Sequence, residues 1–131
     1  MQPLDFLAAV LPSSGVYCAA EFNTKKKEHV FVDSLDGLVT AADLFAAQNR
    51  DVYFALAAFK EAGKRTADNA RVIHSLFIDI DISEEKKYKT RTEGRDAYLE
   101  FMGTTGMHTL GEPIVVSSGG GFHVYWPFTE E

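Results

Sequence analysis

The chain is almost without cysteine: Cys18 is the single one in 131 residues. One thiol cannot close an internal disulfide, and it cannot supply a zinc site built from cysteine and histidine. A secreted disulfide scaffold is therefore excluded, and the cysteine usage is typical of a reducing compartment.

Long hydrophobic runs are also missing. The apolar start, PLDFLAAVLP, has no basic leader and is interrupted by Asp5 and Pro12, and no stretch reaches the length needed to span a bilayer. Low-complexity segments and internal repeats are absent as well. We therefore expect a soluble cytoplasmic protein with no membrane partner.

Positive charge is in deficit. The chain has 13 Lys and Arg against 19 Asp and Glu, a formal net charge of -6, which argues against a dedicated nucleic-acid coat protein. The basic residues are nevertheless grouped, at 25–27 (KKK), 60–65 (KEAGKR) and 86–91 (KKYKTR). Each group is either a set of solvated loop charges or, where groups converge in space, a site for a polyanion.

What is present predicts one domain over 1–131 with an α+β fold, because helical and strand patterns alternate without a doubly wound order. The pattern at 51–59 predicts one strand, the β-branched run at 71–82 predicts a central strand, and 90–103 predicts a helix that closes at Gly103. The remaining expected elements are a short leading helix at 3–11, a hairpin of strands at 15–23 and 25–33, a helix that starts near Ser34 or Asp36, and two antiparallel strands at 112–118 and 121–128.

Two aspartates lie near the end of the expected central strand. Residues two apart in a strand project from the same face, so Asp79 and Asp81 share one face with Phe77, and the alternate residues form a uniformly apolar face. Two carboxylates held together repel each other unless a proton or a cation relieves them. Mg²⁺ or Mn²⁺ is the natural candidate, because such ions use few carboxylates and leave positions for water and phosphate. The alternative is that both aspartates only face solvent.

A glycine run opens the last strand. Gly119, Gly120 and Gly121 permit close approach of a ligand and positive φ values, and N–H groups in such a turn can bind phosphate oxygens, with hydroxyl donors at 117 and 118. His123 falls on the polar side of the strand, where it can donate to a phosphate or act as an acid or base. The alternative is a plain glycine hairpin with a surface histidine. By contrast, His74 falls on the core side of its strand and is expected to be a hydrogen-bonded structural residue, and His108 lies in a loop.

Together, LFIDIDI and VVSSGGGFHVYW resemble the first two motifs of the archaeo-eukaryotic primase superfamily, and in particular its phage and plasmid primase-polymerases. In that family an hhhDhD strand is followed by a glycine segment that leads to a histidine. The resemblance covers roughly residues 50 to 128. It implies a sheet core related to the RNA-recognition motif, with mixed or antiparallel strands and flanking helices. An N-terminal α/β unit at about 1–60 would be joined to a motif-bearing core at about 61–131.

The resemblance also implies template-directed nucleotidyl transfer in DNA replication, in a bacterial or phage-infected cell. Asp79 and Asp81 would hold the catalytic Mg²⁺ or Mn²⁺ ions. The implied partners are a single-stranded DNA template, nucleoside triphosphates and a helicase domain or another replication protein. His123 would act with the nucleotide-binding residues Ser117, Ser118, Gly119, Gly120 and Gly121, and the implied nucleic-acid contacts are Lys60, Lys64, Arg65, Lys87 and Lys89.

The family pattern has a third carboxylate on a strand after the histidine, and here only Glu130 and Glu131 follow His123. We therefore expect a fragment that is truncated at its C-terminal end and has weak or no activity alone. Two alternatives stay open. One is an inactive primase-like module that binds nucleic acid or a replication partner, and the other is a haloacid-dehalogenase-type phosphatase built on Asp79.

Overall fold

The structure, a computed structural model, describes residues 1–23, 25 and 27–129. The chain forms two compact units: the first is Met1–His74 with Thr129, and the second is Ser75–Phe128. The described residues of the two units form three α-helices and short antiparallel sheets, which confirms the predicted α+β class. No helix in the described part of the chain is both long and apolar enough to cross a membrane.

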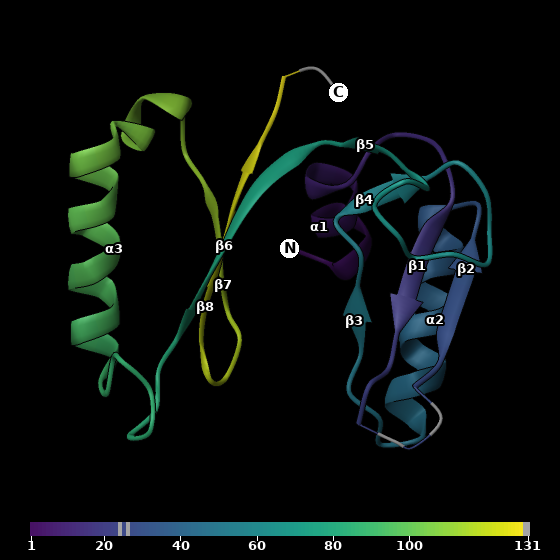
Figure 1. Ribbon diagram of the computed structural model, residues 1–131, viewed down its shortest axis with the longest axis horizontal. Helices are drawn as coiled ribbons and strands as arrows, with labels where there is room; N and C mark the ends of the chain where they lie inside the picture. The colour runs from purple at the N-terminus through teal and green to yellow at the C-terminus, as the bar shows by residue number, and fades with distance from the viewer. Residues whose placement is uncertain (24, 26, 130–131) are drawn as a thin grey trace. The chain divides into compact units, whose positions relative to one another are not determined.

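In the first unit the helix α2 packs against a small sheet, and the helix α1 packs against α2 (Figure 1). The strands β2, β1 and β3 form this antiparallel sheet in that order, while β4 and β5 pair with each other in a separate two-stranded sheet. The strand β1 is buried along its whole length, so it is the centre of this unit's core. The elements are α1 (Pro3–Val10), β1 (Tyr17–Ala20), β2 (His29–Val32), α2 (Leu35–Ala47), β3 (Tyr53–Phe54), β4 (Ala57–Phe59) and β5 (Ala70–Ile73).

The helix α2 forms where the periodicity predicts it. The Ser34 hydroxyl accepts a hydrogen bond from the Gly37 N–H at 3.0 Å and caps the first turn. Leu38, Ala41 and Phe45 recur at helical spacing and are buried, as their apolar pattern requires. The cap and the buried stripe together fix both the start and the orientation of the helix.

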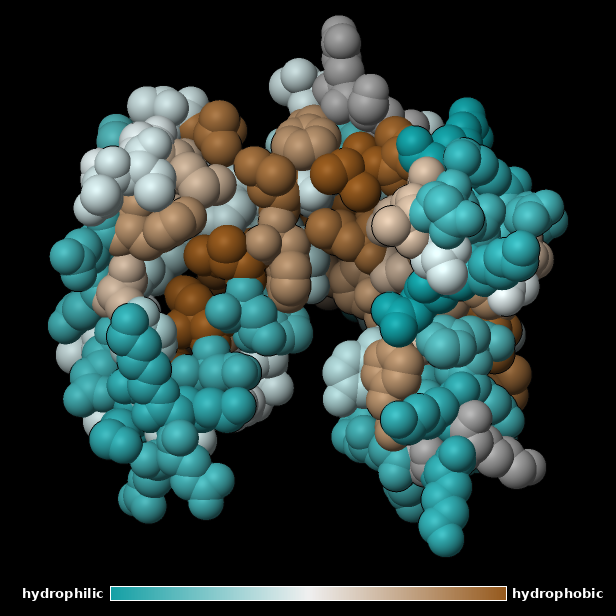
Figure 2. Space-filling model, in the orientation of Figure 1, coloured by the Kyte–Doolittle hydropathy of each residue, from teal (hydrophilic) through white to brown (hydrophobic). Residues whose placement is uncertain are grey.

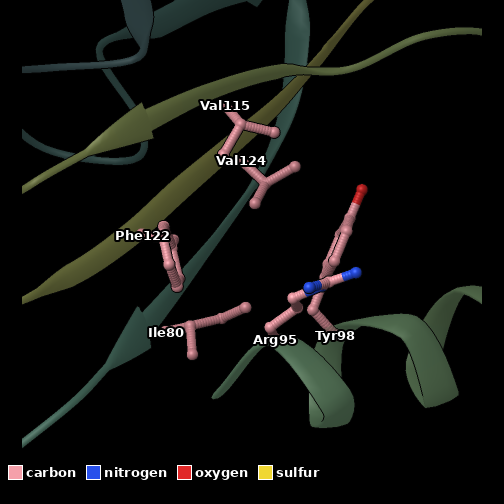
Figure 3. Close-up of a pocket in the computed structure, with 6 residues that line it drawn as sticks. All are labelled: Ile80, Arg95, Tyr98, Val115, Phe122 and Val124. Carbon is pink, nitrogen blue, oxygen red and sulfur yellow. The ribbon is translucent and has the colours of Figure 1, made fainter. Parts of the chain in front are cut away.

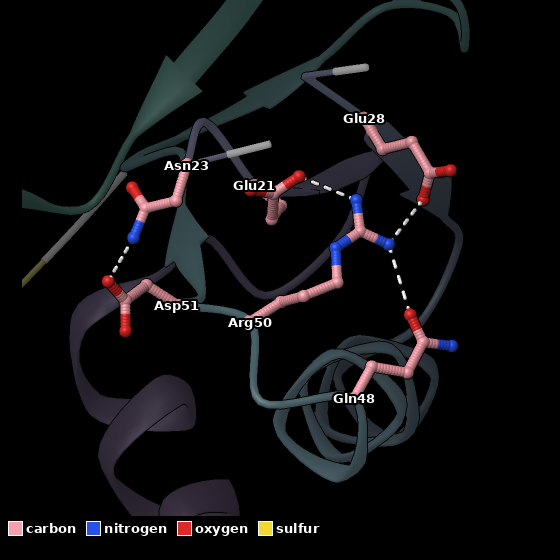
Figure 4. A network of polar contacts seen from close by, with 6 residues as sticks. All are labelled: Glu21, Asn23, Glu28, Gln48, Arg50 and Asp51. Atoms are coloured by element: carbon pink, nitrogen blue, oxygen red, sulfur yellow. Dashed lines mark hydrogen bonds and ion pairs between the residues drawn. The ribbon is translucent and has the colours of Figure 1, made fainter. Parts of the chain in front are cut away.

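A buried ion pair lies at one end of the first sheet (Figure 4). The Glu21 side chain is fully buried, and its carboxylate lies 2.5 Å from the Arg50 guanidinium. Arg50 also donates to Glu28 and to Gln48, each at 3.1 Å. Because α2 ends just before Arg50, these contacts tie the strand end at Glu21 to the C-terminal end of the helix.

The second unit is a three-stranded antiparallel sheet with α3 on one face. The strand order is β6-β8-β7, so β8 is the middle strand. Met102 of α3 packs with Val124 and Trp126 of β8 in the core, and hydrophobic side chains gather between α3 and the strands (Figure 2). The elements are β6 (Ser75–Asp81), α3 (Arg91–Thr105), the 3-10 helix η1 (Met107–Leu110), β7 (Ile114–Ser117) and β8 (Gly121–Pro127).

Several predicted elements are corrected by the structure. The expected central strand at 71–82 is two strands, β5 and β6, and β6 lies at an edge of its sheet, while the expected strand at 51–59 is divided between β3 and β4. Residue preferences alone do not reveal these breaks, because β-rich segments continue while the pairing partner changes. The helix α3 passes through Gly103 and ends at Thr105, and its C-cap, Gly106, has the left-handed φ of 72° that favours glycine.

The histidine predictions have different outcomes. His74 lies between β5 and β6 rather than inside a strand, and its buried Nδ1 has no hydrogen-bond partner in the part of the chain that the structure describes. The expected structural hydrogen bond is therefore not seen at that nitrogen. His108 lies in η1, with its Nδ1 3.1 Å from the Met102 carbonyl oxygen.

Candidate functional site

The two sheet faces of the second unit differ in chemistry. Asp79 is directly opposite His123 in the register of β6 and β8, and Phe77 is opposite Tyr125. Because opposed residues in a β-ladder project from the same face, these four side chains share one face. The alternate residues face α3, and Val124 and Trp126 are buried in its core. The predicted alternation is confirmed in the placing of Asp79 and His123 on one face, whereas Leu76 on the apolar face is 41% exposed and does not belong to the core.

Asp79 and His123 form the centre of the polar face. The Nε2 atom of His123 lies 3.4 Å from Oδ1 of Asp79, and their side chains are 34% and 46% exposed. The Phe77 ring meets the imidazole edge to face, with 5.4 Å between ring centroids. The carboxylate and the imidazole are therefore adjacent, partly accessible and supported by an aromatic side chain.

Asp81 has its own cationic neighbour. Lys86, in the loop after β6, places its Nζ 3.6 Å from Oδ2 of Asp81, and both side chains are more than half exposed. This lysine was not singled out in the sequence, where it is one of several in a basic run. The loop after β6 turns back toward the strand end, and the Lys86 N–H donates a hydrogen bond to the Ser83 carbonyl oxygen. This turn brings Lys86, rather than another lysine of the run, to Asp81.

Tyr125 also belongs to the polar face but is 4% exposed. Burial, and secondly the negative charge of Asp79, raise the pKa of Tyr125 to about 12. The phenol is thus protonated at neutral pH and can serve as a hydrogen-bond donor but not as a base.

The three glycines have different roles. At Gly121, where φ is +155°, a Cβ atom would lie 1.8 Å from the Ile80 carbonyl oxygen, so close approach of β6 requires glycine there. Around Gly119 and Gly120, by contrast, a Cβ would have no atom within 4 Å. Within the described chain the N–H groups of these two residues have no hydrogen-bond acceptor, while the Gly120 carbonyl accepts from Ile82. Two donors of the turn therefore remain available to a ligand.

Ser117 is not brought to the His123 side. It is opposite Phe122 in the register of β7 and β8, and its Oγ accepts a hydrogen bond of 3.0 Å from Arg91 on the α3 face. Ser118 stays in the turn, where its N–H donates to the Gly121 carbonyl. Of the two serines, only Ser118 lies next to the free glycine N–H groups.

The predicted nucleic-acid contacts are divided between the units. Lys87 and Lys89 belong to the second unit, where Lys89 donates to the Glu84 carbonyl and Lys87 lies over the Tyr88 ring. The remaining candidates, Lys60, Lys64 and Arg65, belong to the first unit. Within the 25–27 group, Lys26 lies outside the described residues.

The donor set of the polar face is small. Among the described residues, no group of three or more histidine, cysteine, aspartate or glutamate side chains is arranged to hold a metal ion. Asp79 and Asp81 nevertheless offer two exposed carboxylates on one face, and Mg²⁺ is commonly held by one or two carboxylates together with water and substrate phosphates. Asp79 and Asp81 therefore fit an ion that is also coordinated by a bound phosphate and water, and they do not fit an ion coordinated by protein side chains alone.

Comparison with known proteins gives no relative: no family model, no curated protein and no solved structure matches the chain.

Proposed function

We propose that the second unit is the metal- and nucleotide-binding part of a nucleotidyltransferase of the primase-polymerase kind. The observation that carries this proposal is the pairing of Asp79 with His123 on one sheet face, with Asp81 and the glycine turn at the same end of the strands. A carboxylate group beside an imidazole and free turn N–H groups provides ligands for a metal ion and for a polyphosphate within one surface.

In this proposal the side chains have separate tasks. The N–H groups of Gly119 and Gly120, with the Ser118 hydroxyl, bind phosphate oxygens of a nucleoside triphosphate. His123 donates to the same phosphates, and Asp79 orients its ring through the contact at Nε2. Tyr125 remains a neutral donor beneath them.

Asp79 and Asp81 would hold Mg²⁺ or Mn²⁺. When bound, such an ion would neutralise phosphate charge and favour attack of a hydroxyl on the α-phosphate, with pyrophosphate as the leaving group. The Asp81 carboxylate is paired with Lys86 in a solvent-exposed contact, which is worth at most about 1 kcal/mol and is readily exchanged for a divalent cation.

The partners of this activity are a single-stranded template and nucleoside triphosphates. Lys87 and Lys89 are the basic residues of the same unit that are proposed to contact the template backbone. The exposed Phe77 ring, beside His123, provides an apolar surface on this face for a base or sugar.

A second candidate function is a nucleotide- or nucleic-acid-binding module without catalysis. It is favoured by one observation: each aspartate already has a neighbouring side chain in contact with its carboxylate, His123 for Asp79 and Lys86 for Asp81. In that case the two aspartates hold the side chains of His123 and Lys86 in position and do not bind a metal ion.

Template-directed incorporation separates the two candidates. The chain is incubated with a primed single-stranded template, labelled deoxynucleotides or ribonucleotides and Mn²⁺, with Asp79→Asn and Asp81→Asn as variants and Arg71→Gln as the matched surface control. We expect slow incorporation by the chain and the control, because the described residues bring only two carboxylates to this face, and none by the aspartate variants. Template binding without incorporation, unchanged in the aspartate variants, would favour the second candidate.

A further inference from the structure

A cavity of about 190 Å³ lies on the other face of the sheet in the second unit, between the strands and α3. Its walls are hydrophobic side chains from all three strands (Figure 3). Arg95 and Tyr98 line it from α3, and their side chains lie next to each other (Figure 3). The complete lining is Ile80, Val115, Phe122 and Val124 from the sheet and Arg95 and Tyr98 from the helix.

The cavity arises from the sequence of α3. Gly94 has no side chain, and a Cβ there would lie 2.7 Å from Cδ1 of Ile82, so the helix comes close to β6 at this turn. One turn later Tyr98 packs toward Trp126, with 6.5 Å between the ring centroids. Between Gly94 and Tyr98 no large apolar side chain of the helix fills the space against Phe122 and Val115.

An arginine that has no carboxylate partner among the described residues lies at the border of the cavity. Arg95 makes no ion pair or hydrogen bond within the described residues, and its helical neighbours three and four positions away include no acid. Arg91, one turn earlier, lies over the Phe122 ring at 4.9 Å and donates to the Ser117 hydroxyl, without an acidic partner in the described chain. Arg95 therefore lines the cavity, and Arg91 lies over one of its lining rings, with no acidic partner for either arginine among the described residues.

We propose that this cavity binds a small amphipathic anion, of the class of a single-ring aromatic carboxylate. The volume sets the size, since an apolar cavity of about 150 Å³ is known to hold benzene and this one is somewhat larger. The ring lies among Ile80, Phe122 and Val124, and the carboxylate pairs with Arg95, for which a planar guanidinium is well suited. Burial raises the pKa of Tyr98, so its neutral hydroxyl is an additional donor at the border.

This site is separate from the proposed nucleotide site. Ile80 alternates with Asp79 and Asp81 along β6, so the cavity and the polar face lie on opposite sides of the same sheet. The binding proposal stands whether or not the chain transfers nucleotides.

Titration with 4-ethylbenzoate tests the proposal, and 4-ethylbenzyl alcohol is the matched neutral probe. Methyl chemical shifts in the NMR spectrum report the location through Val115 and Val124, and their concentration dependence gives the affinity. We expect a Kd on the order of 1 mM or tighter for the acid. We expect about tenfold weaker binding of the alcohol, because it lacks the charge that Arg95 pairs.

Three variants complete the test. Arg95→Gln should weaken the acid about tenfold and make acid and alcohol equal, since only the charge pair is lost. Val115→Phe, at a position that is 53% exposed, should reduce binding of both probes by filling the cavity without disturbing the core. Arg71→Gln, an exposed arginine of the first unit, should change nothing.

Equal affinity of the unaltered chain for the acid and the alcohol, or acid binding that survives both Arg95→Gln and Val115→Phe, would overturn the proposal. So would the absence of methyl shifts at Val115 and Val124. A dimer in sedimentation experiments that Val115→Phe dissociates would assign the cavity to a second copy of the chain and would equally reject the small-anion site.

Discussion

Asp79 and His123 are directly opposed in adjacent antiparallel strands, with 3.4 Å between Oδ1 of the carboxylate and Nε2 of the imidazole. The pairing follows from register, because each residue projects from the same face as its cross-strand partner. A single-residue slip would turn one of the two toward α3. The candidate site therefore depends on the features that fix this register, and Gly121 is foremost among them.

Gly121→Ala should destabilise the second unit strongly. The new methyl group would lie 1.8 Å from the Ile80 carbonyl oxygen in the adjacent strand, so β6 and β8 could not keep their present spacing. We expect a loss of at least about 2 kcal/mol in the free energy of unfolding, measured by urea denaturation.

The matched control is Gly120→Ala, in the same turn, where a Cβ has no atom within 4 Å. It should change the free energy of unfolding by no more than about 0.5 kcal/mol. Equal effects of the two substitutions would show that close packing at Gly121 does not determine the strand spacing.

Glu21→Gln should destabilise the first unit. The carboxylate is fully buried beside Arg50, and removing its charge leaves the more exposed Glu28 as the acidic neighbour of the guanidinium among the described residues. We expect a loss of about 3 kcal/mol in the free energy of unfolding, since loss of one partner of a buried pair is costly. Glu28→Gln, whose side chain is 45% exposed, is the control and should cost less than about 1 kcal/mol. A larger cost for Glu28→Gln than for Glu21→Gln would contradict this account.

Stability should fall at high pH through Tyr125. Its pKa is raised from the model-compound value of 10.0 to about 12 in the folded state, so the folded chain holds the phenolic proton more tightly than the unfolded chain. This contribution is fully present below pH 10 and is lost as the pH rises toward 12; near pH 11 the loss is about 1 kcal/mol.

Urea denaturation at pH 9 and pH 11 measures this loss, with Tyr125→Phe as the comparison. The variant should show a smaller decrease in the free energy of unfolding between the two pH values, because it lacks the ionisable hydroxyl. An equal or larger decrease in Tyr125→Phe would show that this tyrosine is not responsible.

The sequence predicts the local features of the site better than its surroundings. Period-two alternation places Asp79 and Asp81 on one face of their strand. The same rule applied to 121–128 places His123 on one face of that strand, and Val124 and Trp126 on the other face. Both follow from backbone geometry that every strand shares.

Features that depend on distant partners are not visible in the sequence. The division of 71–82 at His74 reflects a change of pairing partner from β4 to β8. Similarly, the position of Ser117 on the α3 face follows from its register with Phe122, and the contact of Lys86 with Asp81 depends on how the loop turns back. Residue preferences and spacing contain no information on any of these three relationships.

The most direct test of the account is Mn²⁺-dependent binding of a deoxynucleoside triphosphate, measured by isothermal titration calorimetry with and without the metal. We expect that Mn²⁺ strengthens triphosphate binding and that the double variant Asp79→Asn with Asp81→Asn removes this enhancement, while Arg71→Gln retains it. Triphosphate affinity that is independent of Mn²⁺, or an enhancement that persists in the double variant, would contradict the assignment of the Asp79, Asp81 and His123 face as a metal and nucleotide site.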